Sequence, residues 1–143
     1  MKYDNKISLI LDANSKNEAF ARVSISAFAT QLDPTLEELD DIKMAVSEAV
    51  TNAIIHGYEG IENGQIYINC KIAKDVLYIE IEDKGRGIEN LEKAMEPLYT
   101  SKPDMERSGM GFTVMEAFMD NIEVISEVGK GTKIYLEKKI IKN

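Results

Sequence analysis

The chain has 143 residues, 44% of them hydrophobic, which suits one domain spanning residues 1–143 around a single core. No apolar run approaches the roughly 18 residues that a membrane span requires, and no secretory leader is visible, so we expect a cytoplasmic protein without a membrane partner. The formal net charge of -8 argues against direct nucleic-acid binding, because backbone phosphates require clustered lysine and arginine.

One strand and one helix are predicted ahead of the first proline. Residues 6–12 suit a short strand. Ser15 and Glu18 have the spacing of a capping box, which predicts a helix from there to about Leu32. Asp33-Pro34 should end this helix, since proline cannot continue the backbone hydrogen bonding.

A second, longer helix is predicted directly after the proline. Thr35 and Glu38 repeat the capping-box pattern and mark its start. Apolar residues then recur at helical spacing, as expected for a helix that packs one face on a core: Leu36, Leu39, Ile42, Val46, Ala49, Val50 and Ala53.

The rest of the chain predicts two β-hairpins with a third helix between them. The alternating runs that predict strands lie at 65–73, 76–83, 122–128 and 132–138. The helix is expected at 109–119, and residues 85–108 form the longest irregular segment, a kind that is often functional. We therefore expect an α/β (α+β) two-layer sandwich, with three helices on one face of a mostly antiparallel sheet.

A polar stripe on the second helix is the first candidate site. Glu48, Asn52 and His56 are spaced at i, i+4 and i+8 and so share one side of the helix. One interpretation is a solvated helix face. The other is a functional stripe, because asparagine is a poor helix former that a site would retain for its amide oxygen. For His56, a packing or helix-end role is preferred over a catalytic one.

A second candidate site follows the strand at 76–83. Asp83 ends this strand, and Gly85 and Gly87 come directly after it. A carboxylate at a strand end can accept hydrogen bonds from an exocyclic amine, and glycines let a flat ligand approach the backbone. The alternative is an ordinary polar turn.

The third candidate is the run Arg107-Ser108-Gly109-Met110-Gly111-Phe112 ahead of the predicted third helix. Glycines at a helix N-terminus expose backbone N–H groups, which favours phosphate binding, and Lys102 and Arg107 would add positive charge. A plain glycine-rich helix start is the alternative. The run is not a Walker A loop, because no Gly-Lys-Ser/Thr follows.

Together and in this order, the three motifs resemble the N, G1 and G2 boxes of the GHKL ATPase/kinase superfamily. The matching stretches are Glu48 to Ala53, Asp83 to Gly87 and Ser108 to Phe112, with Gly131-Thr132-Lys133 similar to the last nucleotide-contacting element. This resemblance covers nearly the whole chain and implies a Bergerat-type ATP-binding fold. A stand-alone histidine autokinase is not expected, because the single histidine, His56, lies beside the first box.

Further stretches resemble a narrower family, the anti-sigma-F factors of spore-forming bacteria: Phe20 to Val23, Gln31 to Thr35, Asn52 to Tyr58, Pro97 to Pro103 and Glu106 to Phe112. The resemblance implies an ATP-dependent serine kinase that binds and inhibits a sporulation sigma factor, sigma F. It also implies a homodimer that phosphorylates an anti-anti-sigma antagonist protein on serine. The alternatives are a non-catalytic ATP-binding anti-sigma module, and a related kinase controlling a general-stress sigma factor.

The resemblance also implies roles for residues of the first two boxes. Asn52 would be a ligand of Mg²⁺, and Glu48 would be the general base for the serine hydroxyl. Asp83 would accept a hydrogen bond from the adenine amino group of ATP. Gly87 and Thr132 are implied to lie close to the base, and Gly85 is implied as a further nucleotide-binding residue.

The remaining implied roles concern the phosphates and the partners. Backbone groups of the third box would meet the phosphates: Ser108, Gly109, Met110 and Gly111. Lys102 and Arg107 would lie on a lid, with Arg107 placed to contact the γ-phosphate. Composition alone makes Arg22 a solvated arginine, whereas the resemblance makes it a contact for the sigma factor and the antagonist.

Overall fold

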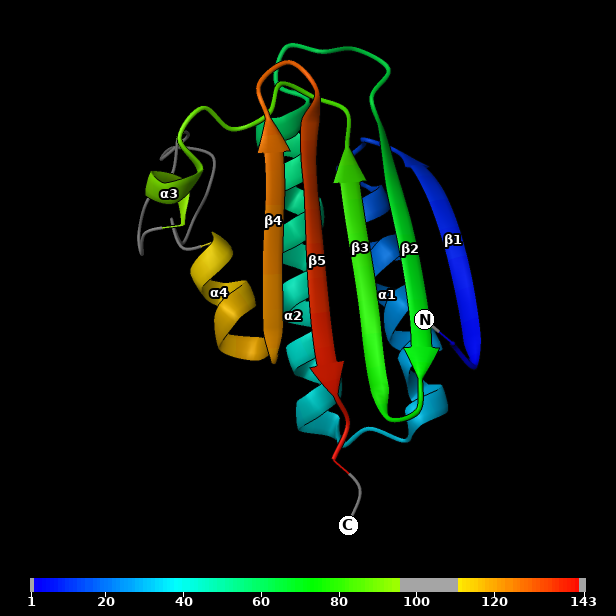
Figure 1. Ribbon diagram of the computed structural model, residues 1–143. Helices are drawn as coiled ribbons and strands as arrows, with labels where there is room; N and C mark the ends of the chain where they lie inside the picture. Colours follow the sequence, from blue (N-terminus) through cyan, green and yellow to red (C-terminus); the bar gives the residue numbers. More distant parts are fainter. Residues whose placement is uncertain (1, 96–110, 142–143) are drawn as a thin grey trace.

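The computed structural model describes residues 2–95 and 111–141. Helices lie on one face of a five-stranded sheet (Figure 1), so the predicted two-layer α/β sandwich is confirmed. The strands are β1 (Asn5–Asp12), β2 (Gln65–Ala73), β3 (Val76–Asp83), β4 (Asn121–Glu127) and β5 (Gly131–Lys139). The α-helices are α1 (Asn17–Ala29), α2 (Leu36–Asn52), α3 (Leu91–Ala94) and α4 (Gly111–Phe118).

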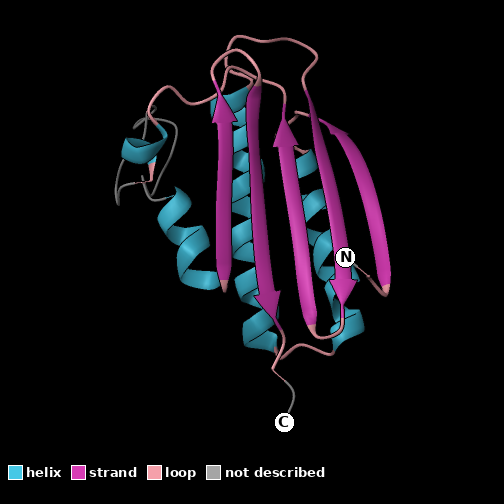
Figure 2. Cartoon of the chain, viewed as in Figure 1, coloured by secondary structure: helices cyan, strands magenta, loops and turns pink. Residues whose placement is uncertain are grey.

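Every pairing in the sheet is antiparallel, in the order β1-β2-β3-β5-β4. The two hairpins predicted from alternation, β2–β3 and β4–β5, are therefore confirmed (Figure 2). The two hairpins are joined by the pairing of β3 with β5, two strands far apart in the sequence. This pairing sets Asp83 opposite Thr132.

The core lies between the sheet and the helices. Alternate strand residues face it because strand side chains point to opposite faces, and the helices bury one stripe each. Its fully buried large side chains include Ile25, Ile42, Val46, Ile66, Ile68, Leu77, Ile79, Ile81, Met115 and Leu136. No helix in the described ranges is long and apolar enough to cross a membrane.

The two long helices begin in different ways. Thr35 and Glu38 form the predicted capping box at the start of α2, with the Thr35 hydroxyl accepting from the Glu38 N–H at 3.0 Å. The capping box predicted at Ser15 is wrong, because α1 begins at Asn17 without a side-chain cap. Ser15 contributes only its backbone carbonyl, to the Glu18 N–H. Leu36 was expected on the buried stripe but is 82% exposed, since the first turn of α2 projects beyond the core.

The chain leaves the helical conformation ahead of Pro34, as predicted from the Asp33-Pro34 sequence. A 3₁₀ turn, Thr30–Leu32, extends α1, and Asp33 then adopts a left-handed conformation with φ 52°. A left-handed residue is a common helix terminator.

The end of α2 differs from a plain helix. Residues Ala53–Gly57 form a π-helical turn, closed by a hydrogen bond of 3.0 Å from the Tyr58 N–H to the Ala53 carbonyl. A π turn takes in one more residue than an α turn, and such turns occur often at functional sites. The side-chain pattern of the helix does not indicate this turn.

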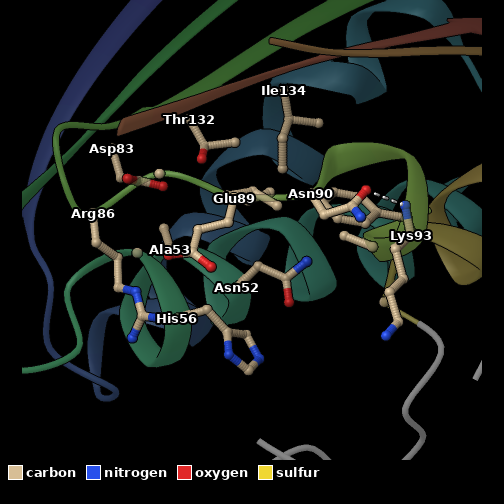
Figure 3. A pocket seen from close by; sticks show the side chains of 16 residues that line it. Asn52, Ala53, His56, Asp83, Arg86, Glu89, Asn90, Lys93, Thr132 and Ile134 are labelled. Carbon is tan, nitrogen blue, oxygen red and sulfur yellow. Dashed lines mark hydrogen bonds between the residues drawn. The ribbon is translucent and has the colours of Figure 1, made fainter. Parts of the chain in front are cut away.

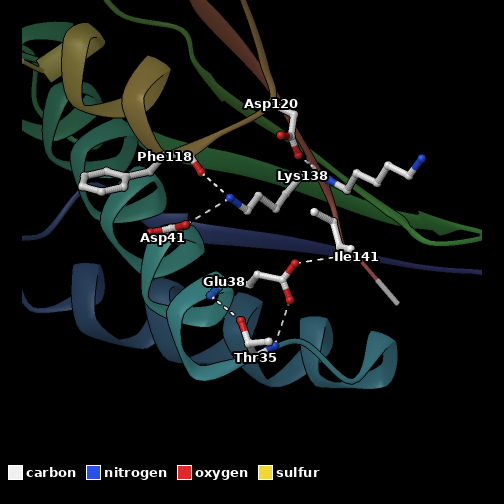
Figure 4. Close-up of polar contacts among 8 residues, drawn as sticks. Thr35, Glu38, Asp41, Phe118, Asp120, Lys138 and Ile141 are labelled. Atoms are coloured by element: carbon white, nitrogen blue, oxygen red, sulfur yellow. Dashed lines mark hydrogen bonds and ion pairs between the residues drawn. The ribbon is translucent and has the colours of Figure 1, made fainter. Parts of the chain in front are cut away.

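The C-terminal part of β5 is tied to both helices beside it (Figure 4). The Lys138 ammonium, 12% exposed, donates to the Phe118 carbonyl at the end of α4 and to the Asp41 carboxylate on α2, at 2.8 and 3.1 Å. Beyond the strand, the Ile141 N–H donates to Glu38 at 3.0 Å. The bond to Phe118 anchors the C-terminal end of α4, and the bonds to Asp41 and Glu38 anchor the N-terminal half of α2.

Candidate functional site

A cavity of about 400 Å³ lies where the end of α2, the loop after β3, helices α3 and α4, and strand β5 meet (Figure 3). Its volume is within the range of about 300–1,000 Å³ that is usual for small-molecule sites. The described lining residues are Asn52, Ala53, His56, Gly57, Asp83, Arg86, Gly87, Ile88, Glu89, Asn90, Lys93, Ala94, Gly111, Phe112, Thr132 and Ile134.

Asp83 places a buried carboxyl group in this cavity. It ends β3 on the core-facing side of the strand and is only 5% exposed. Burial raises the pKa of the carboxyl to about 6, while hydrogen bonds from the Gly85 and Thr132 backbones oppose the shift. A carboxylate has room for further donors beyond these two. A ligand group that donates hydrogen bonds, such as an aromatic amine, would match it.

Glycines make the close packing around Asp83 possible. A Cβ on Gly57 would lie 2.7 Å from the Asp83 carboxyl carbon, and one on Gly85 would lie 1.8 Å from the Gly57 carbonyl oxygen. Gly87 has φ +76°, and its Cβ would lie 2.2 Å from the Glu127 carbonyl oxygen. The π turn, the loop after β3 and the β4–β5 turn therefore meet with backbone against backbone, which leaves the cavity open to a flat ligand.

A hydroxyl network lies on the β5 side of the cavity. The Ser126 hydroxyl on β4 accepts from the Ile88 N–H at 2.8 Å and lies 2.8 Å from the Thr132 hydroxyl. Thr132 is 8% exposed, so this contact orients a nearly buried side chain next to Asp83. Sequence reasoning missed Ser126, because a serine in a strand carries no distinguishing signal.

Helices α2 and α3 supply the polar groups across from the sheet. Asn52 ends α2 and His56 lies in the π turn that follows it, and both line the cavity. On α3, the Asn90 side chain caps the helix by accepting from the Lys93 N–H at 3.0 Å, and both residues line the cavity. Residues 85–108 were predicted to be irregular, and this prediction is wrong at Leu91–Ala94, where α3 contributes to the cavity.

The structure brings together several predicted site residues from distant parts of the chain: Asn52, Asp83, Gly87, Gly111 and Thr132. Gly85 is buried directly behind Asp83. Glu48, half-buried one turn before Asn52, is not among the described lining residues. The other predicted phosphate-contacting residues lie outside the described residues: Lys102, Arg107, Ser108, Gly109 and Met110.

Arg22 lies on α1, apart from the cavity. Its side chain is 36% exposed, and its guanidinium forms an ion pair of 2.9 Å with Glu18, one turn earlier. The geometry is that of an ordinary i, i+4 helix pair. The arginine is thus accessible but held along its own helix.

The chain is similar to known proteins over almost its whole length. Residues 11–138 match the family described as histidine kinase-like ATPase domain. The anti-sigma F factor of Clostridium acetobutylicum is 66% identical over 137 residues, which cover 95% of this chain and 94% of that protein. The anti-sigma F factor of a Geobacillus species is 56% identical over 139 residues, covering 97% and 95%.

A solved structure shares the fold at low sequence identity. It contains the RsbU and RsbW domains of a Mycobacterium tuberculosis protein, and superposes with a TM-score of 0.67 at 18% identity. The match covers 96% of this chain and 32% of that one. The chain therefore belongs to the histidine kinase-like ATPase domain family, which implies ATP binding, and within it to the group of the anti-sigma F factors.

Proposed function

We propose that this protein is a Mg²⁺-dependent serine kinase that binds and inhibits a sporulation sigma factor of the sigma F type and phosphorylates its antagonist. The observation that carries the nucleotide part is the buried Asp83 carboxyl in a cavity that also contains Asn52 and Thr132. The partner part is supported by relatives at 56–66% identity that are named anti-sigma F factors.

Asp83 selects the base in this proposal. Its carboxylate accepts a hydrogen bond from the adenine amino group, and Thr132 and Gly87 line the same cavity. The low exposure of Asp83 strengthens such a bond, because water competes poorly for a buried acceptor. Family membership implies that the protein binds ATP, and the Asp83 carboxyl gives a physical reason why the base is adenine.

Asn52 is the metal ligand in this proposal. Among the described residues, no group of three or more histidine, cysteine, aspartate or glutamate side chains is placed to hold a metal ion. A single amide oxygen suits Mg²⁺, which usually takes few protein ligands and completes its shell with phosphate oxygens and water. When bound, the metal would neutralise the charge that develops during phosphoryl transfer.

Glu48 is the proposed general base. It lies four residues before Asn52 on α2, which is about 6 Å along the helix axis. A carboxylate at that distance is suited to accept the proton of a serine hydroxyl that approaches the phosphate end of the cavity. Phosphate contacts by Ser108 to Gly111, Lys102 and Arg107 complete the proposal and concern mainly residues outside the described ranges.

The names of the relatives support a sigma factor as one partner, and the antagonist is part of the proposal. Arg22, accessible on α1, is the proposed contact for the sigma factor and for the antagonist. We also propose that the protein acts as a homodimer in the cytoplasm. The net charge of -8 supports a protein partner rather than direct contact with DNA.

A phosphoryl-transfer assay tests the proposal. Purified protein, Mg²⁺ and γ-labelled ATP are mixed with the sigma F antagonist from the same genome. Glu48→Gln should abolish labelling of the antagonist serine and leave ADP affinity within about twofold. Glu37→Gln, an exposed change on the same helix, is the matched control and should label normally.

The outcomes separate the alternatives. ATP binding and sigma capture without any label would favour a non-catalytic anti-sigma module. Label on a general-stress antagonist, supplied in parallel, in preference to the sigma F antagonist would favour the related stress kinase. Normal labelling by Glu48→Gln would show that Glu48 is not the base.

A further inference from the structure

Tyr58 lies directly behind the Asp83 turn, outside the cavity lining. It follows the π turn and is 7% exposed. Its ring packs on Gly64, where a Cβ would come within 2.5 Å of two ring atoms. Its hydroxyl donates to the Gln65 carbonyl, at the start of β2, and accepts from the Lys84 N–H at 2.7 Å, just beyond the end of β3.

The first three backbone N–H groups after Asp83 each have a hydrogen-bond acceptor. The Lys84 N–H donates to the Tyr58 hydroxyl, the Gly85 N–H to the Asp83 carboxylate at 3.0 Å, and the Arg86 N–H to the Gly57 carbonyl at 2.8 Å. Two of these three acceptors belong to consecutive residues, Gly57 and Tyr58. The turn that positions the Asp83 carboxylate is therefore held by hydrogen bonds to Gly57 and Tyr58, at the end of the π turn.

Of the two acceptors that Gly57 and Tyr58 supply, the Gly57 carbonyl belongs to the backbone and the Tyr58 hydroxyl to a side chain. A substitution can therefore remove the hydroxyl without altering the backbone. We propose that Tyr58 is a positioning residue for Asp83, and that its hydroxyl sets the selectivity of the cavity for adenine over guanine. This inference rests on the proposed pairing of Asp83 with the base. Burial raises the pKa of the Tyr58 hydroxyl, which keeps it protonated as a donor to Gln65 at neutral pH.

Selectivity depends on where the carboxylate lies. Adenine presents an amino donor at the position where guanine presents a carbonyl oxygen, so a fixed carboxylate attracts one base and repels the other. A site built around such a hydrogen bond discriminates strongly, because the wrong ligand leaves a buried group unpaired. Without the hydroxyl, the Lys84 N–H and the Gln65 carbonyl lose their partner and the turn relaxes, so the carboxylate is held less firmly.

The test compares ADP and GDP affinities, measured by titration calorimetry, in the whole protein and in Tyr58→Phe. The variant keeps the ring on Gly64 and removes only the hydroxyl. We expect the ratio of GDP to ADP dissociation constants to fall by about five- to tenfold, the loss expected when one neutral hydrogen bond is removed. Tyr78→Phe, on the opposite face of β3, is the matched control and should keep the ratio.

A second control separates positioning from stability. Thr35→Ala removes the cap at the far end of α2 and should lower stability without changing the ratio. An unchanged ratio in Tyr58→Phe would overturn the inference, whereas a wild-type protein that does not prefer ADP would overturn the proposed role of Asp83 itself. If Tyr58→Phe does not fold, amide hydrogen exchange decides: a slowly exchanging Lys84 N–H in the wild-type protein supports the inference, and rapid exchange overturns it.

Discussion

Replacing Asp83 by asparagine would separate the effect of the buried carboxyl group on stability from its effect on nucleotide binding. The side chain keeps its shape and its acceptor for the Gly85 N–H, but it loses the negative charge and one of its two acceptor oxygens. Burial raises the pKa of this carboxyl from 3.8 to about 6. The folded protein therefore binds the proton more tightly than the unfolded chain does.

The magnitude follows from this shift of roughly two pKa units, each of which corresponds to about 1.4 kcal/mol. Because the folded pKa is the higher one, the contribution of the group to stability is complete below about pH 4. It is lost as the pH rises through about 6, for a total of about 3 kcal/mol. An asparagine is neutral throughout, so Asp83→Asn should be more stable than the wild type by up to about 3 kcal/mol at pH 7.5.

The assay is urea unfolding of the nucleotide-free protein, followed by circular dichroism because the chain has no tryptophan. The stability difference should shrink toward zero near pH 4, and ADP binding by the variant should be lost at pH 7.5. Asp40→Asn, at an exposed site on α2, is the control and should show neither effect. A variant that is no more stable than the wild type at pH 7.5, or a difference that does not depend on pH, would refute the reasoning.

Three further changes test the packing that supports the site. Lys138→Met should lower the free energy of unfolding by about 1–3 kcal/mol, because the Phe118 carbonyl and the Asp41 carboxylate lose their shared donor; adding Asp41→Asn should then cost little more, and fully additive losses in urea unfolding would contradict the contact. Thr35→Ala should cost about 1 kcal/mol in the same assay by removing the α2 cap, and a neutral result would argue against the capping box. Gly87→Ala should cost more than about 1 kcal/mol and weaken ADP binding, since its Cβ would meet the Glu127 carbonyl at φ +76°; unchanged calorimetric affinity would show that the loop is not rigid there.

Local patterns predicted the elements well where a single rule operates. The β2 and β3 strands have the bounds that alternation predicted, because one face of each is buried and the side-chain period is two. The capping box at Thr35 is correct, whereas the one at Ser15 is not. Both have the same residue spacing, but ahead of α1 the Lys16 and Asn17 N–H groups donate to Asn14, and the helix begins at Asn17 without a side-chain cap.

In the candidate site too, some residues were predicted from local motifs and others were missed. Asn52, Asp83 and Thr132 were identified by motif, and the structure places all three on one cavity. Ser126 and Tyr58 were missed as supporting residues, because their importance lies in hydrogen bonds to residues 5 to 38 positions away. The proposed roles of Glu48, Arg22 and the phosphate-contacting run remain predictions.

Periodicity and residue type were enough to predict the order of the strands and of the longer helices, most of the buried positions and the polar residues available for chemistry. Only the tertiary structure decided that β5 inserts between β3 and β4, which sets Thr132 opposite Asp83. It also decided how far the pKa of Asp83 rises, because a pKa shift comes from burial and neighbouring dipoles that no local pattern specifies. The π turn and the glycine contacts belong to the same class, since they are set by how closely distant backbones approach.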